Sequence, residues 1–471
     1  MPLSATVSVL GPPKASLADS ARRLAALAWP VFIGQLSVLA FGTIDTLLLA
    51  RAGATELAAL AVGGAAYITI FIGLAGTLMA LAPIVGQLSG ARRFVQAGQQ
   101  VHQAVWMALA LTVLGALALM FPEPFLALAR SPAEVETKVR GYLMALAVSL
   151  PAALLFAVYR GFNIAIGRPR MVMLLQIAGM AIKLPLSVLL TFGAPTLGLP
   201  ALGVLGCGIA TAVAMWAQLL IALIVMRHDP AAATYRLFGH GLARPDFAAL
   251  RAMIRLGVPI GASILVEVTG FAFMSIFIAR LGTTAVAGHQ IAVNLVSVLF
   301  MLPLALANAS STLVALRLGG GHAESARRLG WHAMAIGCGV AAVLGLAVFL
   351  ARQPVLRLYT HDAAVIAAAM PLLAWLAVFH LADAAQTIAA FVLRAHKIAV
   401  LPMVIYVVAL WGLGLGGGYA LAFDLPGFVP AWLQGARGFW VACTAGLILA
   451  SVGLAGAMHG LIGPRRDERP V

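Results

Sequence analysis

Charged residues are scarce in this chain of 471 residues: they make up 10% of it, whereas 62% of its residues are hydrophobic. An ordinary soluble domain carries about 25% charged residues. The shortage excludes a soluble globular domain, because even a very large core cannot absorb so many uncharged runs of about 20 residues. The sequence therefore predicts a polytopic membrane protein, whose first partner is the lipid bilayer.

Other absences exclude whole classes of function. The three cysteines (Cys207, Cys338 and Cys443) lie in apolar segments without metal-type spacing, so they indicate neither disulfides nor a zinc site. The sequence has no P-loop lysine motif, zinc-protease histidine pair or nucleophile elbow, which argues against an ATP-driven pump and an intramembrane enzyme. The glycine run at 412–417 has dinucleotide-loop spacing but no preceding strand, so it indicates close helix packing. We expect no enzyme activity and no cofactor.

The net charge of +15 does not indicate a nucleic-acid partner. The basic residues fall between apolar runs and form no patch interleaved with aromatics. Most of them lie on one side of the membrane if the N-terminus is cytoplasmic, so the positive-inside rule places both termini in the cytoplasm. The residues before Pro30 lack a compact apolar core with a cleavage site, so we interpret them as a cytoplasmic tail. We expect the cytoplasmic (inner) membrane of a bacterium.

Long apolar runs predict an all-α protein with twelve transmembrane helices. Barrel strands would alternate over about ten residues, whereas these runs are apolar all round. The runs lie at roughly 27–50, 60–88, 101–121, 141–159, 171–193, 203–226, 256–279, 286–316, 331–350, 366–393, 400–423 and 438–461.

An internal repeat divides these helices into two sets of six. When the chain is slid along itself until Pro30 meets Pro259, Arg51 meets Arg280 without a gap; we call this displacement the repeat offset. Because six helices return the chain to the same side, the halves should be parallel repeats about an axis along the membrane normal, with a cavity between them. We expect an N-terminal lobe at 1–226 with a cytoplasmic tail, a cytoplasmic linker at 227–255, and a C-terminal lobe with its tail at 256–471.

Three of the chain's 15 acidic residues lie inside apolar runs: Asp45, Glu267 and Asp383. An ionised acid at bilayer depth costs at least ~2.5–3.5 kcal/mol, so such groups usually face a water-filled cavity and handle ions, protons or cationic substrates. The repeat does not preserve them, since Asp45 aligns with Met274 and Glu267 with Val38. We infer that the two lobes have different tasks.

Each acid also has a plainer interpretation. Glu267 lies midway along its helix, where a coupling site is expected, but it could simply bond to a neighbouring helix. Asp383 shares a helical face with Gln386 and Thr387, which suits a sodium ion or a proton but also a polar packing seam. Asp45 lies nearer the outer end, where an acid can also reach the interface.

Several segments together resemble multidrug and toxic compound extrusion (MATE) transporters of the NorM-like branch. They lie in the family's order along the chain, at 27–46, 79–90, 266–269, 287–294 and 383–386. The resemblance implies a MATE-like fold and cation-coupled efflux of bulky organic cations. It implies that Glu267 and Asp383 belong to a sodium or proton site, and that Asp45 acts in proton coupling or substrate binding. His289 and Asn294 match the family pattern and are weaker candidates for ligand contact.

Two positions depart from the pattern of that family. Lys183 stands where the family usually carries asparagine, and a buried lysine needs a partner or loses its proton. Our hypothesis is that Lys183 pairs with Asp45, which moves coupling towards Glu267 and Asp383; a solvated lysine lining the cavity is the alternative. Phe379 replaces a frequent tyrosine and removes one possible cation ligand.

His380 adjoins Asp383 and could titrate with it, although a lone helical histidine is more often a packing residue.

These observations predict a secondary antiporter that works by alternating access. It would export organic cations or amphiphilic drugs in exchange for Na+ or H+, and we expect it to act as a monomer. The alternative is a flippase for lipid-linked oligosaccharides from the wider superfamily, which predicts a cationic cavity. A receptor or scaffold that transports nothing would not need three buried acids.

Overall fold

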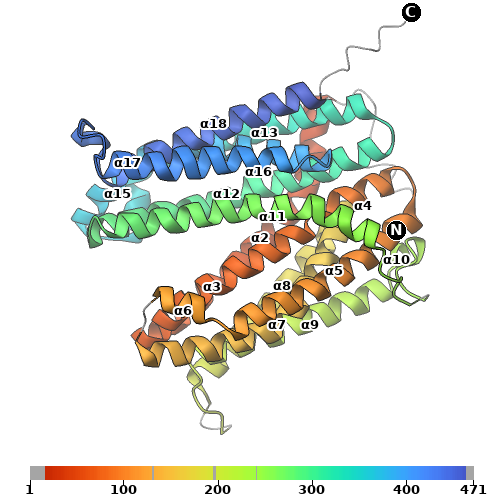
Figure 1. Cartoon of the computed structure of the whole chain (residues 1–471), viewed down its shortest axis with the longest axis horizontal. Helices are drawn as coiled ribbons and strands as arrows, with labels where there is room; N and C mark the ends of the chain where they lie inside the picture. The colour runs from red at the N-terminus through yellow and green to blue at the C-terminus, as the bar shows by residue number, and fades with distance from the viewer. Residues whose placement is uncertain (1–15, 130–131, 195–197, 240, 463–471) are drawn as a thin grey trace, which may run out of the picture. The chain divides into compact units, whose positions relative to one another are not determined.

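The computed structural model describes residues 16–129, 132–194, 198–239 and 241–462. Within these residues it contains twelve candidate membrane spans and no strand, which confirms the all-α prediction (Figure 1). The first six spans are formed by α2 (Leu17–Ala52), α3 with α4 (Ala54–Leu78, Leu81–Gly90), α5 (Phe94–Met120), α7 (Ala133–Ala165), α8 (Pro169–Phe192) and α9 (Val204–Arg227). The other six are α11 (Phe247–Ala279), α12 (Thr283–Gly319), α13 (Ala323–Leu350), α15 (Ala363–Ala395), α16 with η2 and α17 (Val400–Tyr406, Val407–Gly417, Gly418–Ala422), and α18 (Ala436–Ile462).

Several helices are longer than the apolar runs that predicted them. Helix α2 begins at Leu17 rather than near residue 27, and α11 begins at Phe247, inside the expected linker. Their extra turns carry charged side chains, and hydropathy alone does not register a helix that extends beyond the hydrocarbon layer. The remainder of the expected linker contains the short helix α10 (Pro230–Thr234). Two more short helices, α6 (Glu123–Ala129) and α14 (Arg352–Tyr359), follow the third span of each set.

The internal repeat is present in the secondary structure. The span of α3 and α4 covers Ala54–Gly90, and α12 covers Thr283–Gly319, which is the same interval moved by the repeat offset at both ends. Both intervals are preceded by a glycine with positive φ, Gly53 at 145° and Gly282 at 111°, a conformation that side chains with a Cβ rarely adopt. The short helices α6 and α14 also correspond. The two halves are therefore copies of one six-helix scaffold.

The contacts within the chain define two compact units that are not two continuous halves. Among the described residues, unit 1 holds residues 33–261, and unit 2 holds residues 16–32 together with residues 262–462. Helix α2 thus changes unit between Phe32 and Ile33, and α11 changes unit between Gly261 and Ala262. Phe32 and Ile33 correspond to Gly261 and Ala262 under the repeat offset, so the two helices change unit at the same place in the repeat. The two units are defined by contacts, whereas the expected lobe limits were defined by the order of the spans. The units therefore do not test those limits.

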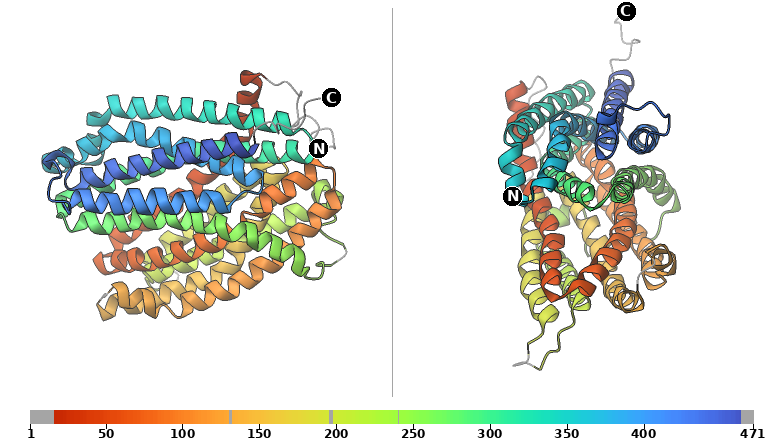
Figure 2. Two further views of the ribbon diagram at one scale, coloured as in Figure 1. Left: turned by 45° about the horizontal axis from the view of Figure 1, so that its top comes forward. Right: turned by 90° about the vertical axis from the view of Figure 1, so that its left-hand side faces the viewer.

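One helix lies at the centre of each unit. In unit 1, α7 packs against α3, α5 and α9; in unit 2, α15 packs against α12, α13 and α18 (Figure 2). The two helices correspond in the repeat, yet only α15 carries buried charged residues, Asp383 and Arg394. The same helix of the repeat therefore lies at the centre of both units, but only its copy in unit 2 carries buried charged residues.

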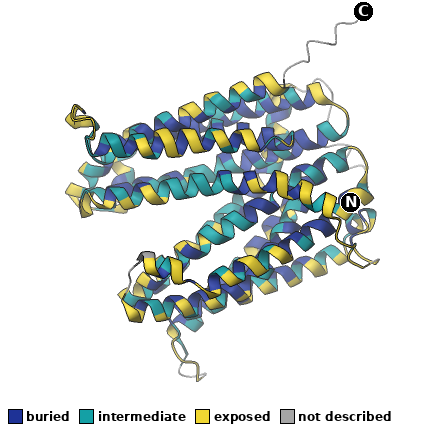
Figure 3. Ribbon diagram, in the orientation of Figure 1, coloured by how far each residue is buried: buried dark blue, intermediate teal, exposed yellow. Residues whose placement is uncertain are grey.

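Large apolar side chains remain exposed along the spans (Figure 3). Examples are Val113, Leu114, Val148, Val343 and Leu346, each more than half exposed. In water such faces would be unfavourable, whereas lipid chains cover them without penalty. The exposed faces are those of a protein solvated by a bilayer.

The glycine-rich run at 412–417 packs closely against α18, as the sequence predicted. It lies in η2, an eleven-residue π-helical stretch, a wide helix form that glycine permits and that is frequent at functional sites. A Cβ on Gly414 would lie 3.5 Å from the Cα of Cys443, and one on Gly446 would collide with the carbonyl oxygen of Ala409. The packing of η2 on α18 depends on these missing side chains.

We predict that Gly446→Ala lowers the stability of the purified protein by about 1–3 kcal/mol, because η2 must move away from α18 to admit the methyl group. Thermal unfolding in detergent measures the loss. The matched control is Gly456→Ala on the same helix, where a Cβ would meet nothing within 4 Å. Equal melting temperatures for the two variants would show that η2 does not constrain α18.

Candidate functional site

Three oxygen-bearing side chains of α15 lie together, as their spacing predicted. Asp383, Gln386 and Thr387 are all buried, with exposed fractions of 4%, 0% and 3%. The Nε2 amide of Gln386 donates to Oδ1 of Asp383 at 3.0 Å and to Oγ1 of Thr387 at 3.1 Å. The amide thus fixes the carboxylate on the helical face where the sequence placed it.

Glu267 of α11 belongs to the same cluster. Its carboxylate is close enough to interact electrostatically with Asp383 and also interacts with the side chain of Gln386. Asp383 is buried and Glu267 is half-buried, and the two carboxylates repel each other when both are ionised. A cation or a proton between them relieves that repulsion, so the two acids together can act as a reversible cation site.

The donor set suits a hard cation or a proton. Besides the two carboxylates, the buried Oε1 of Gln386 has no hydrogen-bond partner among the described residues. Oxygen ligands of this kind suit an alkali cation, whereas transition metals prefer imidazole or thiolate. No group of three or more histidine, cysteine or acidic side chains with metal-binding geometry occurs in the part of the chain that the structure describes. Glu267, Asp383 and Gln386 would hold Na+ if Na+ is the coupling ion.

Arg394 and Tyr406 also lie near Glu267, and neither was predicted from the sequence. Arg394 is buried near the end of α15, its guanidinium lies 4.4 Å from the ring centroid of Phe391, and Nη1 has no partner within the described residues. It is close enough to Glu267 and Tyr406 for electrostatic interaction, and Tyr406 is itself buried. By sequence alone, Arg394 counts among the loop cations. Its place two helical turns after Thr387 was the available signal of a shared face.

The turn that follows α15 lies outside the spans. Burial there lowers the pKa of His396 to about 4 and lowers the pKa of Lys397 below its ordinary value. His396 is therefore mostly uncharged at neutral pH.

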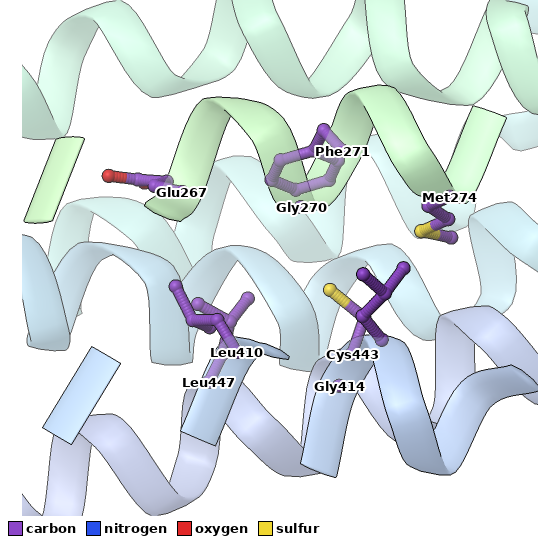
Figure 4. A pocket seen from close by; sticks show the side chains of 9 residues that line it. Glu267, Gly270, Phe271, Met274, Leu410, Gly414, Cys443 and Leu447 are labelled. Carbon is purple, nitrogen blue, oxygen red and sulfur yellow. The ribbon is translucent and has the colours of Figure 1, made fainter. Parts of the chain in front are cut away.

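A small apolar pocket adjoins Glu267 (Figure 4). Three helices line it, α11, η2 and α18, with one carboxylate, one aromatic ring and two sulfur-containing side chains. The lining residues are Glu267, Gly270, Phe271, Met274, Leu410, Gly414, Leu415, Cys443 and Leu447. A flexible, polarizable wall with one acid suits an amphiphilic cation of variable shape.

His289 is fully buried, and both of its ring nitrogens are engaged. Trp440 Nε1 donates to Nδ1 at 3.2 Å, so Nε2 carries the proton and donates to Oγ of Ser275 at 2.9 Å. Ser275 in turn donates to the carbonyl oxygen of Phe271. This network joins α12 to α11 and α18, and it gives His289 a packing role. Whether His289 also contacts a ligand stays a prediction.

The other candidates are placed as follows. His380 is fully buried, neither ring nitrogen has a partner among the described residues, and no hydrogen bond or ion pair there joins it to Asp383. Asn294 is exposed and accepts a hydrogen bond from the Tyr359 hydroxyl at 2.9 Å. Phe379 packs against the rings of Trp440 and Phe271, so it contributes apolar packing beside Asp383.

The acid of unit 1 has a different partner. Lys183 of α8 donates from Nζ to Oδ2 of Asp45 on α2 at 2.6 Å, which confirms the pairing hypothesis. Both side chains are nearly fully buried, and the ammonium also lies 4.9 Å from the ring centroid of Phe41. Cys207 and Ser187 adjoin the carboxylate. The alternative of a solvated lysine is excluded in this structure.

We predict that Lys183→Met destabilises the protein by about 3–5 kcal/mol, because it leaves Asp45 as an uncompensated buried charge. The double variant Asp45→Asn with Lys183→Met should recover most of the loss, since it removes both charges. Thermal unfolding of the two single variants and the double variant completes the cycle. Additive losses would show that the pair has no coupling energy.

Known families and structures provide an independent comparison. The MatE family model matches residues 30–189 and 259–420, two segments that start at the pair of prolines defining the repeat offset. The chain is 39% identical over 434 residues to "Probable multidrug resistance protein NorM" of Aromatoleum aromaticum (92% of each chain), and 35% identical over 434 residues to "Multidrug resistance protein MdtK" of Pectobacterium atrosepticum (92% of this chain, 93% of that one).

The fold also matches solved structures. A MATE family transporter of the MOP superfamily in an outward-facing conformation superposes with a TM-score of 0.85 at 18% identity, covering 97% of this chain and 98% of the other. The eukaryotic MATE transporter AtDTX14 gives a TM-score of 0.83 at 20% identity, with coverage of 95% and 97%. The family match spans both halves, and the relatives cover nearly the whole chain, so this protein belongs to the MatE family.

Proposed function

We propose that the protein is a secondary active exporter of organic cations and amphiphilic drugs, which it exchanges for Na+ or H+. The observation that carries the proposal is the pair of neighbouring carboxylates in unit 2, the buried Asp383 and the half-buried Glu267, which both interact with the side chain of Gln386. The curated relatives are named for multidrug resistance, which supports the substrate class. We further propose a monomer in the inner membrane of a bacterium, with both termini in the cytoplasm.

Exchange follows from competition for the two carboxylates. With neither ion nor substrate bound, their repulsion favours a cation, and the pocket beside Glu267 accepts the apolar part of an organic cation. Entry of Na+ or H+ from outside neutralises the carboxylates and weakens their hold on the substrate, which then leaves. The membrane potential contributes about 2.3 kcal/mol per elementary charge for each 100 mV, so net inward charge movement drives export.

Arg394 supports this cycle as a tethered positive charge. Its guanidinium interacts with Glu267 from the end of α15, and it is held over Phe391 rather than in water. It can therefore balance Glu267 when no ion is bound, so that the empty carrier does not bury two uncompensated acids. In unit 1 Lys183 is paired with Asp45, which would leave the exchangeable charge in unit 2.

We predict that Glu267→Gln and Asp383→Asn each abolish gradient-driven efflux of a fluorescent organic cation from proteoliposomes, because each removes half of the competition site. Imposing a sodium gradient and a pH gradient separately identifies the ion. Glu324→Gln is the matched control, since Glu324 is an exposed acid of the same unit paired with Arg327. If the wild type moves no cation under either gradient, the drug-export proposal is wrong.

We predict that Cys443→Phe reduces the affinity for bulky cations at least about tenfold, because the ring occupies the pocket beside Glu267. Cys443→Ala, which enlarges the pocket, should retain transport. Concentration dependence of efflux in the same liposomes measures both variants. Unchanged affinity in Cys443→Phe would place the substrate elsewhere.

A further inference from the structure

A group of basic side chains lies at one end of unit 2, away from the carboxylates. Arg23 is near the start of α2, Arg317 is in the last turn of α12, and Arg328 and His332 lie in the first turns of α13. We call these four residues the basic cluster. A hydrogen bond of 2.8 Å between Ser20 Oγ and His332 Nδ1 joins α2 to α13 within it. Three spans therefore begin or end at the cluster.

Arg317 is the buried centre of the cluster. Only 2% of it is exposed, and Nη1 donates to the carbonyl oxygen of Ser325 at 3.0 Å, which holds the guanidinium beside the first turn of α13. Nε and Nη2 have no hydrogen-bond partner among the described residues. A buried cation with unused donors is unfavourable unless an anion compensates it.

The neighbouring charges increase this need for an anion. Arg23 is close enough to repel Arg317, and both Arg317 and Arg328 act on His332. Two acids lie in the same turns, but neither is paired with Arg317. Glu324 is shared between Arg327 at 2.7 Å and Arg328 at 3.8 Å. Asp19 accepts a hydrogen bond from the Ser16 hydroxyl at 2.8 Å and lies near Arg23. The first turn of α13 adds the partial positive charge of a helix N-terminus.

We propose that the basic cluster binds a phosphate group, supplied by the headgroup of an anionic phospholipid. The location supports a lipid source, because Arg317 ends one span, Arg23 lies near the start of another, and the phosphates of a bilayer lie at such span ends. Arg317 would donate from Nε and Nη2, the forked arrangement that matches phosphate oxygens. Free inorganic phosphate has the same chemistry, and the experiment below separates the two sources.

A bound phosphate would stabilise the position of residues 16–32. These residues belong to unit 2 although they are remote from it in sequence. Within them, Ser20 is hydrogen-bonded to His332, and Arg23 lies near Arg317. The lipid would therefore stabilise the attachment of this half-helix to α12 and α13. We expect the folded protein to be more stable in the presence of the lipid.

The test measures the melting temperature of the purified full-length protein in neutral detergent. Short-chain phosphatidylglycerol, short-chain phosphatidylcholine and inorganic phosphate are added separately at equal concentration. At about 100 times its dissociation constant, phosphatidylglycerol should raise the wild-type melting temperature by about 2–3 °C. Each variant is compared with its own melting temperature without lipid, so a loss of basal stability does not obscure the result.

Arg317→Gln and Arg23→Gln should each lose most of that shift, and Arg317→Lys should keep only part of it, because lysine retains the charge without the fork. Arg22→Gln is the matched control, since Arg22 is exposed on the adjacent position of α2. A full lipid shift in Arg317→Gln, or an equal response to phosphatidylcholine, overturns the proposal. An equal shift with inorganic phosphate alone keeps the site and identifies a soluble phosphate as its ligand.

Discussion

The repulsion between Glu267 and Asp383 is the constraint on which the site in unit 2 depends. The buried carboxylate of Asp383 and the half-buried carboxylate of Glu267 lie near one another, and the side chain of Gln386 interacts with both. Low dielectric surroundings strengthen repulsion as much as attraction, so both acids cannot stay ionised there without a cation. Arg394 supplies one positive charge near Glu267, and an apolar pocket adjoins the same carboxylate.

The repeat shows how one scaffold was adapted to two electrostatic solutions. Asp45 and Lys183 of unit 1 correspond to Met274 and Gly412 of unit 2 under the repeat offset. Where unit 1 has a closed ion pair, unit 2 therefore has a pocket wall and a π-helical glycine. The pair compensates the acid of unit 1 within its own unit, whereas the corresponding positions of unit 2 carry no charge.

The spans, the repeat and the Asp45–Lys183 pair could be predicted from the sequence, because each leaves a local or periodic signal. An apolar run marks a span, and a lysine in such a run requires an acid nearby. Arg394 could not be placed in the same way, since an arginine near the end of an apolar run is usually solvated, and only tertiary packing of α15 against its neighbours buries it. The π-helical form of η2 depends likewise on packing against α18.

The exchange of half-helices between the units has a consequence for how the chain can be divided. Residues 16–32 complete unit 2, and the corresponding start of α11 completes unit 1, so neither six-helix half contains the whole of its own unit. Either half alone would lack the half-helix that completes its unit. A cut of the chain between the two sets of six helices would therefore not separate the two units.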